Sequence, residues 1–373
     1  MTTGLPSSTL LPKGLPQVPE GNETGDLADD EEFEVVEWDR AEDFAMATAI
    51  EGAEGLNPSF DDVKDRADWP RWEEAIQVEL KNLKDNGTWT MVERPAGANV
   101  VDSRWVLRVK KNAAGEVEKY KARLVAKGFT QIYGVDFYET YAPVARLASF
   151  RLLLAIAAHN DWPVDAFDFD SAYLNSTLDN EDETIYLEQP PHYPTMDRKR
   201  YVWKLLKTLY GLKQGAKNWY DALCKALVDL GFQRAEADHG IFFKRIGADI
   251  IVLAVHVDDC MLVGSSRKLI DEFKVQINKT YKISDLGAIH WLLGIKITRN
   301  LPNHIISLSQ HAYIDSIILR YNFTDLKPSA IPMDPSAPLS KSQSPTKLAD
   351  IARMKNVPYR EAVGSLMYAA MGT

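Results

Sequence analysis

The residues of this sequence most able to do chemistry are two adjacent carboxylates between two runs of β-forming residues. Asp258 and Asp259 follow residues 250–257 and precede residues 260–264. A two-residue hairpin usually carries Asn-Gly or Asp-Gly, because its central residues need positive φ. Two like charges at the end of a buried strand pair are costly unless a cation such as Mg²⁺ offsets them. By chemistry alone, an exposed turn that is merely acidic remains an equal alternative.

A second acidic segment lies in residues 165–170. In a strand, Asp168 and Asp170 share one face while Phe167 and Phe169 share the other. This arrangement favours metal ligation. From the segment alone, it is equally open that one aspartate caps the next helix and the other is solvated.

Three carboxylates from two separate strands meet the requirement of phosphoryl transfer with two metal ions. The ions in such sites lie about 3.5–4 Å apart and stabilise the attacking and leaving oxygens. The protein contributes mainly position and charge stabilisation. The sequence therefore points to Asp258, Asp259 and an aspartate of the second segment, Asp168 or Asp170, as candidate metal-binding catalytic residues.

Hydrophobic periodicity and turn signals predict the elements that must position these residues. They indicate a mixed α+β fold with antiparallel pairings rather than an alternating βαβ array. The stretch 324–347 is rich in proline and reads as loop. Helices are predicted from 69 to about 86 and at 149–158, 216–230, 266–280 and about 310–321, and strands at 103–111, 117–125, 164–170, 250–257, 260–264, 290–298 and 304–309.

Charge is distributed unevenly along the 373 residues, whose formal net charge is -10. Residues 1–62 hold 16 acidic and 2 basic residues, and the remainder holds 41 basic and 37 acidic residues. The first segment lacks periodic apolar residues, so we expect a disordered acidic linker, or else a partner-binding tail. No stretch approaches the roughly 20 apolar residues of a membrane span, and no signal peptide is recognisable. We therefore expect a cytoplasmic protein without a membrane partner.

Two cysteines, Cys224 and Cys260, predict neither a disulfide framework nor a zinc site. Trp203, Tyr210 and Trp219 are expected in the core rather than as base-stacking platforms. Residues 104–127 are strongly basic and suit contact with a triphosphate or a template backbone, although a solvated hairpin face is an equal alternative. The basic residues of this stretch are Arg104, Arg108, Lys110, Lys111, Lys119, Lys121, Arg123 and Lys127.

Taken in order, these segments resemble the reverse transcriptases of copia-type retrotransposons. The resemblance covers roughly residues 69–373, and its specificity comes from an ordered set of motifs rather than from any one of them. The motifs are 86–89 (NGTW), 120–129 (YKARLVAKGF), 139–144 (ETYAPV), 167–175 (FDFDSAYLN), 209–214 (LYGLKQ), 256–259 (HVDD), 292–295 (LLGI) and 359–368 (YREAVGSLMY).

The resemblance implies a fingers–palm–thumb polymerase with an antiparallel palm sheet. It implies RNA- or DNA-templated DNA synthesis from dNTPs with two Mg²⁺ ions, on an RNA template and a DNA primer. It selects Asp168 rather than Asp170 as the third metal ligand. The remaining implied roles are Tyr173 as the residue that screens the incoming sugar, Gln214 in the nucleotide pocket, Arg123 and Lys121 at the triphosphate, and Leu293 and Gly294 at the primer grip.

The sequence departs from the family at His256, where tyrosine is usual. It stops where the family continues into RNase H, and we expect a piece of a larger polyprotein whose other parts are its partners, within virus-like particles. We divide it into a linker (1–62), fingers, palm and the start of the thumb (63–323), and a loop-rich thumb or connection segment (324–373). The alternative functions are an inactive remnant that binds nucleic acid or a partner and, less favoured, a metal-dependent nuclease.

Overall fold

The fold is that of a computed structural model of the chain. All the residues that it describes belong to one unit of the chain, Glu42–Thr373. Apart from its last positions, the acidic segment predicted to be disordered lies outside the described residues. The described residues are 58–111, 117–178, 184–331, 336, 338–355 and 357–372.

Two helices open the described part of the chain. Helix α2 (Phe60–Val63) begins at a capping box between Ser59 and Asp62. The predicted disorder of residues 1–62 is therefore wrong for residues 60–62, whose backbone the cap holds in a helical turn. Helix α3 (Trp69–Asp85) follows as predicted and ends where Gly87 adopts a φ of +60°.

Two small sheets surround α3. One is the antiparallel hairpin of β3 (Ser103–Lys111) and β4 (Val117–Ala126), as predicted. The other has the order β1-β7-β6-β2, in which only β2 and β6 run parallel. Its strands, none of which the sequence analysis predicts, are β1 (Trp89–Glu93), β2 (Val100–Val101), β6 (Tyr186–Leu187) and β7 (Tyr201–Leu205).

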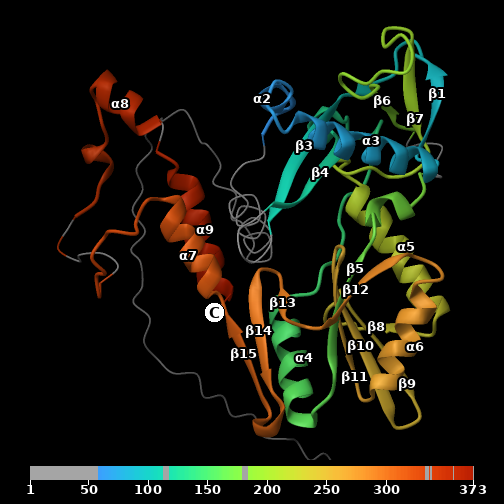
Figure 1. Ribbon diagram of the computed structural model, residues 1–373, viewed down its shortest axis with the longest axis vertical. Coiled ribbons are helices and arrows are strands. Elements are labelled where there is room, and N and C mark those ends of the chain that lie inside the picture. Colours follow the sequence, from blue (N-terminus) through green and yellow to red (C-terminus); the bar gives the residue numbers. More distant parts are fainter. Residues whose placement is uncertain are drawn as a thin grey trace, which may run out of the picture. The chain divides into compact units, whose positions relative to one another are not determined.

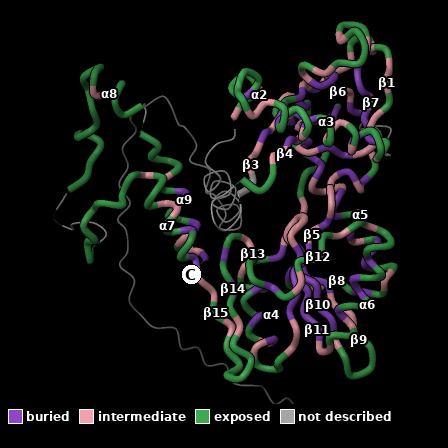
Figure 2. Tube along the Cα trace, in the orientation of Figure 1, coloured by how far each residue is buried: buried purple, intermediate pink, exposed green. Residues whose placement is uncertain are grey.

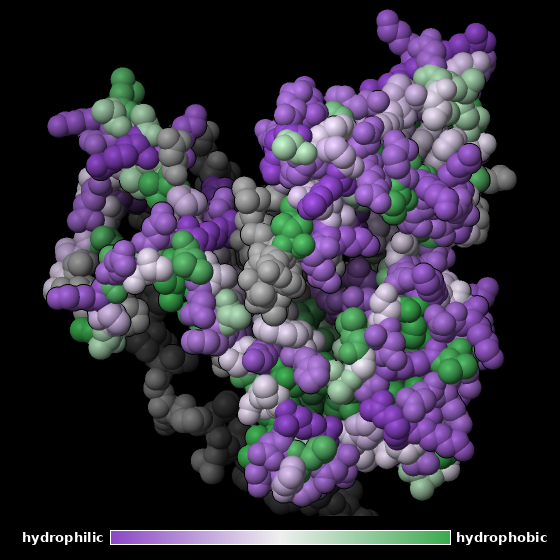
Figure 3. Space-filling model, viewed as in Figure 1, coloured by the Kyte–Doolittle hydropathy of each residue, from purple (hydrophilic) through white to green (hydrophobic). Residues whose placement is uncertain are grey.

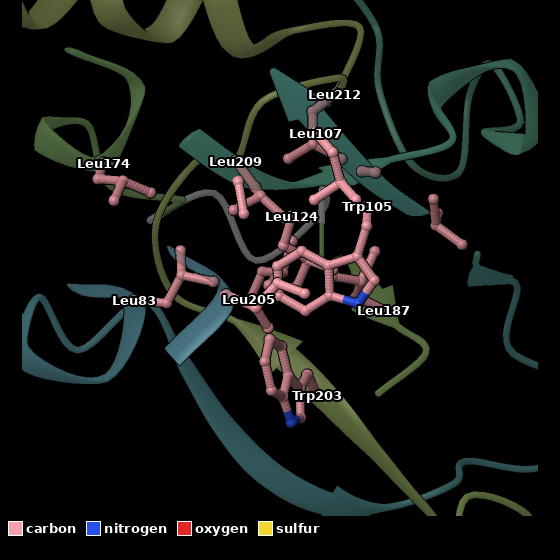
Figure 4. Close-up of a cluster of buried hydrophobic side chains, with 14 of the residues drawn as sticks. Leu83, Trp105, Leu107, Leu124, Leu174, Leu187, Trp203, Leu205, Leu209 and Leu212 are labelled. Atoms are coloured by element: carbon pink, nitrogen blue, oxygen red, sulfur yellow. The ribbon is translucent and has the colours of Figure 1, made fainter. Parts of the chain in front are cut away.

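A hydrophobic core joins α3 to both sheets (Figure 4). Leu83 of α3, Leu124 of the hairpin and Trp203 of β7 converge in it. Trp203 stacks on Trp89 with ring centroids 4.2 Å apart. The expectation that Trp203 is a core residue is therefore confirmed, and α3 is fixed against β4 by apolar burial.

A six-stranded sheet forms the centre of the fold (Figure 1), with the order β12-β5-β11-β10-β9-β8. Its middle strands are the most buried, as Figure 2 shows. Every pairing within it is antiparallel. Its strands are β5 (Val164–Phe169), β8 (Gln233–Arg234), β9 (Ile241–Ile246), β10 (Asp249–His256), β11 (Asp259–Gly264) and β12 (Ile283–Ala288).

Helices cover both faces of this sheet. Phe167 and Phe169 pack with α5 (Gly215–Asp229) and α6 (Arg267–Ile277) on one face. Val164 and Ala166 pack with α4 (Leu147–Asn160) on the other face. The odd and even residues of β5 thus separate between two cores, as the pleat of a strand requires.

The last part of the described chain is a three-stranded antiparallel sheet followed by helices. The sequence predicts one strand over 290–298, but Leu293 and Gly294 have φ values of +48° and +76° and turn the chain back. Residues 348–355 and 359–372 form two helices within the segment 324–373, for which the sequence predicts loop-rich structure. The elements are β13 (Trp291–Leu292), β14 (Ile295–Asn300), β15 (Ile305–Ser309), α7 (His311–Arg320), α8 (Leu348–Lys355) and α9 (Tyr359–Gly372).

The surface of the molecule carries both hydrophobic and hydrophilic residues. On the face in Figure 3, hydrophobic residues lie in scattered groups between hydrophilic ones. Among the described residues, no helix is long and apolar enough to span a bilayer.

Candidate active site

The two acidic segments of the sequence meet at the end of the central sheet. Asp168 is the penultimate residue of β5 and Asp259 is the first residue of β11, and the two are direct partners in the antiparallel register. Asp258 precedes β11, and its carbonyl oxygen accepts a hydrogen bond from the amide of Phe169 at 3.3 Å. Strand pairing therefore brings together carboxylates that lie about ninety residues apart in the sequence.

The turn that carries Asp258 differs from the expected one by one residue. His256 pairs with Asp259, so the central residues of the hairpin are Val257 and Asp258 rather than the two aspartates. Val257 has a φ of +60°, a conformation that is rare for β-branched residues and costs about 1–3 kcal/mol. The indole of Trp219 on α5 donates to the carbonyl oxygen of Val257 at 2.9 Å and helps to hold it there.

Pleating determines which way the carboxylates point. Asp168 shares a face of β5 with Val164 and Ala166, and Asp259 shares a face of β11 with Met261. Because these apolar neighbours belong to the core under α4, both carboxylates lie on that face, beyond the end of the core. Phe167 and Trp219 lie in the opposite core, which confirms the core position predicted for Trp219.

The electrostatics of the pair are unfavourable without a counter-charge. Burial raises the pKa of Asp259 to about 7, and the charges of Asp258 and Asp168 and a hydrogen bond with the Asp168 side chain add to the shift. Burial also raises the pKa of the neighbouring Cys260 thiol.

The donor set suits a hard divalent cation. It consists of carboxylate oxygens, which Mg²⁺, Mn²⁺ and Ca²⁺ prefer over the softer metals. A cation would take the place of the proton that a carboxylate with raised pKa retains, as metal binding generally does. Within the described ranges, no three His, Cys, Asp or Glu side chains already stand in a metal-holding arrangement.

Asp170 follows the end of β5 and stays on the face of the sheet that strand alternation predicts, because its partner Ser284 is paired directly with Asp168. Strand β5 ends at Phe169, and Asp170 turns toward β12. Its carboxylate accepts a hydrogen bond from Ser284 at 2.6 Å and pairs with Lys282 at 3.2 Å. Ser171 precedes the short 3₁₀ helix Ala172–Asn175, has a φ of +52° and makes no capping hydrogen bond with its side chain. The partners of Asp170 therefore lie on the β12 side of β5, whereas Asp259 lies on the β11 side.

An aromatic and cationic cluster lies beside the carboxylates. The Tyr173 and Tyr210 rings meet edge to face with centroids 4.8 Å apart. The guanidinium carbon of Arg123 on β4 lies 4.3 Å from the centroid of Tyr210. Burial raises the pKa of Tyr173 and of Tyr210 to about 12, with the Asp258 charge raising and the Arg123 charge lowering both. One site thus contains four side chains that are linked by ring contacts or by the effect of charge on pKa, namely Arg123, Tyr210, Tyr173 and Asp258.

Gln214, expected in the nucleotide pocket, is buried at the start of α5. Its amide nitrogen donates to the carbonyl oxygen of Asp136 at 2.7 Å, and its amide oxygen accepts from Gln131 at 3.0 Å. The side chain therefore fastens the loop around residues 131–136. Sequence reasoning missed this role because both partners lie about 80 residues away.

The other two groups of predicted site residues lie on separate elements. Leu293 and Gly294 form the turn between β13 and β14, and the Tyr368 hydroxyl of α9 donates to the carbonyl oxygen of Leu293. Lys121 lies on β4 in the wall of a cavity of about 480 Å³ between β4 and α3. A larger cavity among the described residues, about 680 Å³, runs along α5 and includes none of the three aspartates.

Comparisons with known proteins agree with the motifs. A family model for reverse transcriptase (RNA-dependent DNA polymerase) matches residues 86–335. The retrovirus-related Pol polyprotein from transposon TNT 1-94 of Nicotiana tabacum is 37% identical over 300 residues, which are 80% of this chain and 22% of that protein. The polyprotein from transposon RE1 of Arabidopsis thaliana is 36% identical over 301 residues, covering 80% of this chain and 20% of that protein.

A putative transposon Ty5-1 protein of Saccharomyces cerevisiae is 36% identical over 203 residues, which are 54% of this chain and 63% of that protein. The chain thus spans only about a fifth of the length of the two plant polyproteins. The predicted resemblance is confirmed, and the chain belongs to the reverse transcriptase (RNA-dependent DNA polymerase) family, as represented in the Pol polyproteins of copia-type retrotransposons.

Proposed function

We propose that this chain is an RNA-directed DNA polymerase that also copies DNA. It would join dNTPs to the 3′-hydroxyl of a DNA primer on an RNA or DNA template. The observation that carries the proposal is the register of Asp168 opposite Asp259, with Asp258 in the adjoining turn. Family membership supports a nucleic-acid template and primer as partners and a dependence on divalent metal.

Asp168, Asp258 and Asp259 would hold two Mg²⁺ ions, which when bound lower the barrier to phosphoryl transfer by stabilising negative charge. The fold's own contribution is placement of these oxygens. Pairing of β5 with β11 fixes two of the carboxylates, and the strained Val257 turn presents Asp258. Such pre-organisation avoids reorganising the site during the reaction.

The cluster beside the carboxylates would receive the nucleotide. Arg123 and Lys121 bear the positive charge that a triphosphate needs. Tyr173 would lie under the sugar and exclude a 2′-hydroxyl by volume. Gln214 would shape this pocket through the loop that it fastens, since both ends of its amide are engaged inside the protein.

We assign the sheets and helices to the parts of a polymerase. Residues 63–323 would comprise fingers, palm and the start of the thumb, with the six-stranded sheet as palm. Residues 324–373 would continue the thumb toward a connection, and the Leu293–Gly294 turn would contact the primer. Other parts of a retrotransposon polyprotein would be its further partners.

The test is extension of a DNA primer on a homopolymer RNA template by the purified 373-residue chain with Mg²⁺. Asp168→Asn, Asp258→Asn and Asp259→Asn each keep the shape of the side chain and remove its charge. Each should lower the rate by orders of magnitude, because charge stabilisation in the transition state is lost. Asp170→Asn is the matched control and should be much milder.

Activity equal to the parent in Asp258→Asn or Asp259→Asn would refute the assignment. A well-folded parent with no extension activity and no increase in melting temperature with Mg²⁺ would favour the second function, an inactive remnant that keeps the fold for binding. The observation in favour of the remnant is His256, directly opposite Asp259, at a position where the family usually has tyrosine.

A further inference from the structure

Glu79 of α3 is a partly buried carboxylate that the proposed mechanism does not use. It lies against β4, whose outer edge pairs with no strand of the described residues, since β3 and β4 form a two-stranded sheet. The amide of Leu124 on that edge donates to Glu79 Oε1 at 3.3 Å. Two residues on, the amide of Ala126 donates to the carbonyl oxygen of Tyr210 at 2.8 Å. A carboxylate and a loop carbonyl thus take the place of a third strand.

The peptide group that Glu79 holds is the one that joins Arg123 to Leu124. Glu79 also acts on the Arg123 side chain through its charge. Burial raises the pKa of Glu79, while the charges of Arg123 and Lys121 and hydrogen bonds from the Leu124 amide and the Asn82 side chain oppose that shift. A half-buried carboxylate beside two cations stays ionised more readily than burial alone would allow.

Arg123 is fixed from a second side by the Tyr210 ring, 4.3 Å from its guanidinium carbon. Tyr210 in turn packs on Tyr173. Glu79 and Tyr210 therefore both contact the outer edge of β4, the strand from which Arg123 projects. The cavity of about 480 Å³ between α3 and β4 is lined by Glu79, Lys121 and Ser171, among others, so it extends from α3 to the end of the catalytic strand segment.

We propose that Glu79 is a positioning residue that orients Arg123, and with it Lys121, toward the triphosphate of the incoming nucleotide. This inference rests on the proposed polymerase function. The direction in which the dNTP affinity changes distinguishes a positioning role of Glu79 from a purely electrostatic one. By Coulomb's law, removal of a negative charge beside a triphosphate site strengthens anion binding. Loss of a positioning residue weakens anion binding instead, because part of the binding free energy is then used to order the Arg123 side chain.

The test compares nucleotide binding by the full chain and its variants. Each protein is bound to an RNA template with a dideoxy-terminated DNA primer and Mg²⁺, and the Kd of the next complementary dNTP is measured. Glu79→Gln keeps an oxygen for the Leu124 amide and loses only the charge. Glu74→Gln, on the same helix and cavity, is the matched control for net charge.

Glu79→Gln should raise the Kd about tenfold, equivalent to about 1.4 kcal/mol, while Glu74→Gln should change it less than about twofold. In an Arg123→Ala background, Glu79→Gln should have no further effect, since residues that act through one another are not additive. With an extendable primer, the rise should appear in KM for dNTP rather than in kcat. A merely structural role would lower the active fraction and leave KM alone.

An unchanged or lower Kd in Glu79→Gln overturns the inference, and so does an equal effect in the Arg123→Ala background. If Glu79→Gln does not fold, Glu79→Asp shortens the reach to Leu124 with the charge kept, and the same rise in Kd is expected; binding as in the parent overturns the inference. A parent that binds dNTP but extends no primer refutes the proposed function alone. A parent that binds no dNTP refutes both.

Discussion

Replacement of Asp165 by asparagine should destabilise the protein far more than a surface substitution. Asp165 lies on β5 three residues before Asp168, and its side chain is 1% exposed. Arg267 of α6 donates two hydrogen bonds to its carboxylate, at 2.7 and 2.8 Å. Lys274 bridges Asp165 and Asp285 of β12 at 2.5 Å each. The network thus fastens α6 to the strand that carries Asp168 and to the neighbouring strand β12.

The size of the expected stability loss depends on which partners Arg267 and Lys274 keep after the substitution. Removing one partner of a buried ion pair costs about 3–5 kcal/mol, because the remaining charge is left buried. The Arg267 side chain is 49% exposed and can exchange its lost hydrogen bonds for water, and Lys274 keeps Asp285. We therefore expect the lower end of that range, about 3 kcal/mol, or a melting temperature lower by about 6–12 °C.

The assay is urea and thermal unfolding of the parent, Asp165→Asn and Asp271→Asn. Asp271 pairs with the same arginine at 3.6 Å, but its side chain is 60% exposed. Its replacement should therefore cost less than about 0.5 kcal/mol. Equal losses in the two variants, or a loss below about 1 kcal/mol in Asp165→Asn, would refute the reasoning from buried charge.

The stabilities of the parent and of Asp165→Asn should also respond differently to pH. Burial by itself would raise the pKa of Asp165, but hydrogen bonds from Arg267 and Lys274 hold it below its usual value. The stability that it contributes is therefore present above the unfolded-state pKa and is lost as the pH falls through the lower folded-state pKa. The difference between the parent and Asp165→Asn should be constant near neutral pH and shrink below about pH 4.

Three further outcomes are expected. Tyr173→Ala should incorporate ribonucleotides that the parent rejects, whereas Tyr173→Phe should not, because exclusion rests on ring volume; single-nucleotide incorporation rates decide. Asp259→Asn should melt higher than the parent at pH 8 without divalent cations, since burial and two neighbouring carboxylates raise the Asp259 pKa to about 7. The parent loses this stability as the pH rises from the unfolded-state pKa through about 7, so the gain should fade as the pH is lowered toward 4 in the melting series. Tyr368→Phe removes the hydroxyl bonded to Leu293 and should cost about 1 kcal/mol in urea unfolding.

Local patterns in the sequence were enough to predict many of the elements and to indicate candidate metal ligands. Continuous runs of apolar β-forming residues predict β10 and β11, alternating aspartate and phenylalanine residues predict β5, and helical spacing predicts α3 and α5. The acidic residues between apolar strands mark Asp168, Asp258 and Asp259 as candidates, because a buried like-charge cluster needs a counter-ion. These features lie within short windows, where side-chain periodicity and turn preference act directly on the backbone.

Other features were decided only by tertiary structure. The strands β2 and β6 have two residues each and are too short to show a period, and the edge strand β12 contains polar residues and a glycine that obscure one. These strands exist because a neighbour offers backbone partners. The register that places Asp168 opposite Asp259 and the enclosure of the Gln214 amide join residues about 80 or more positions apart. Backbone hydrogen bonds are the same for every residue type, so such distant pairings leave little local trace and are selected by how the whole core packs.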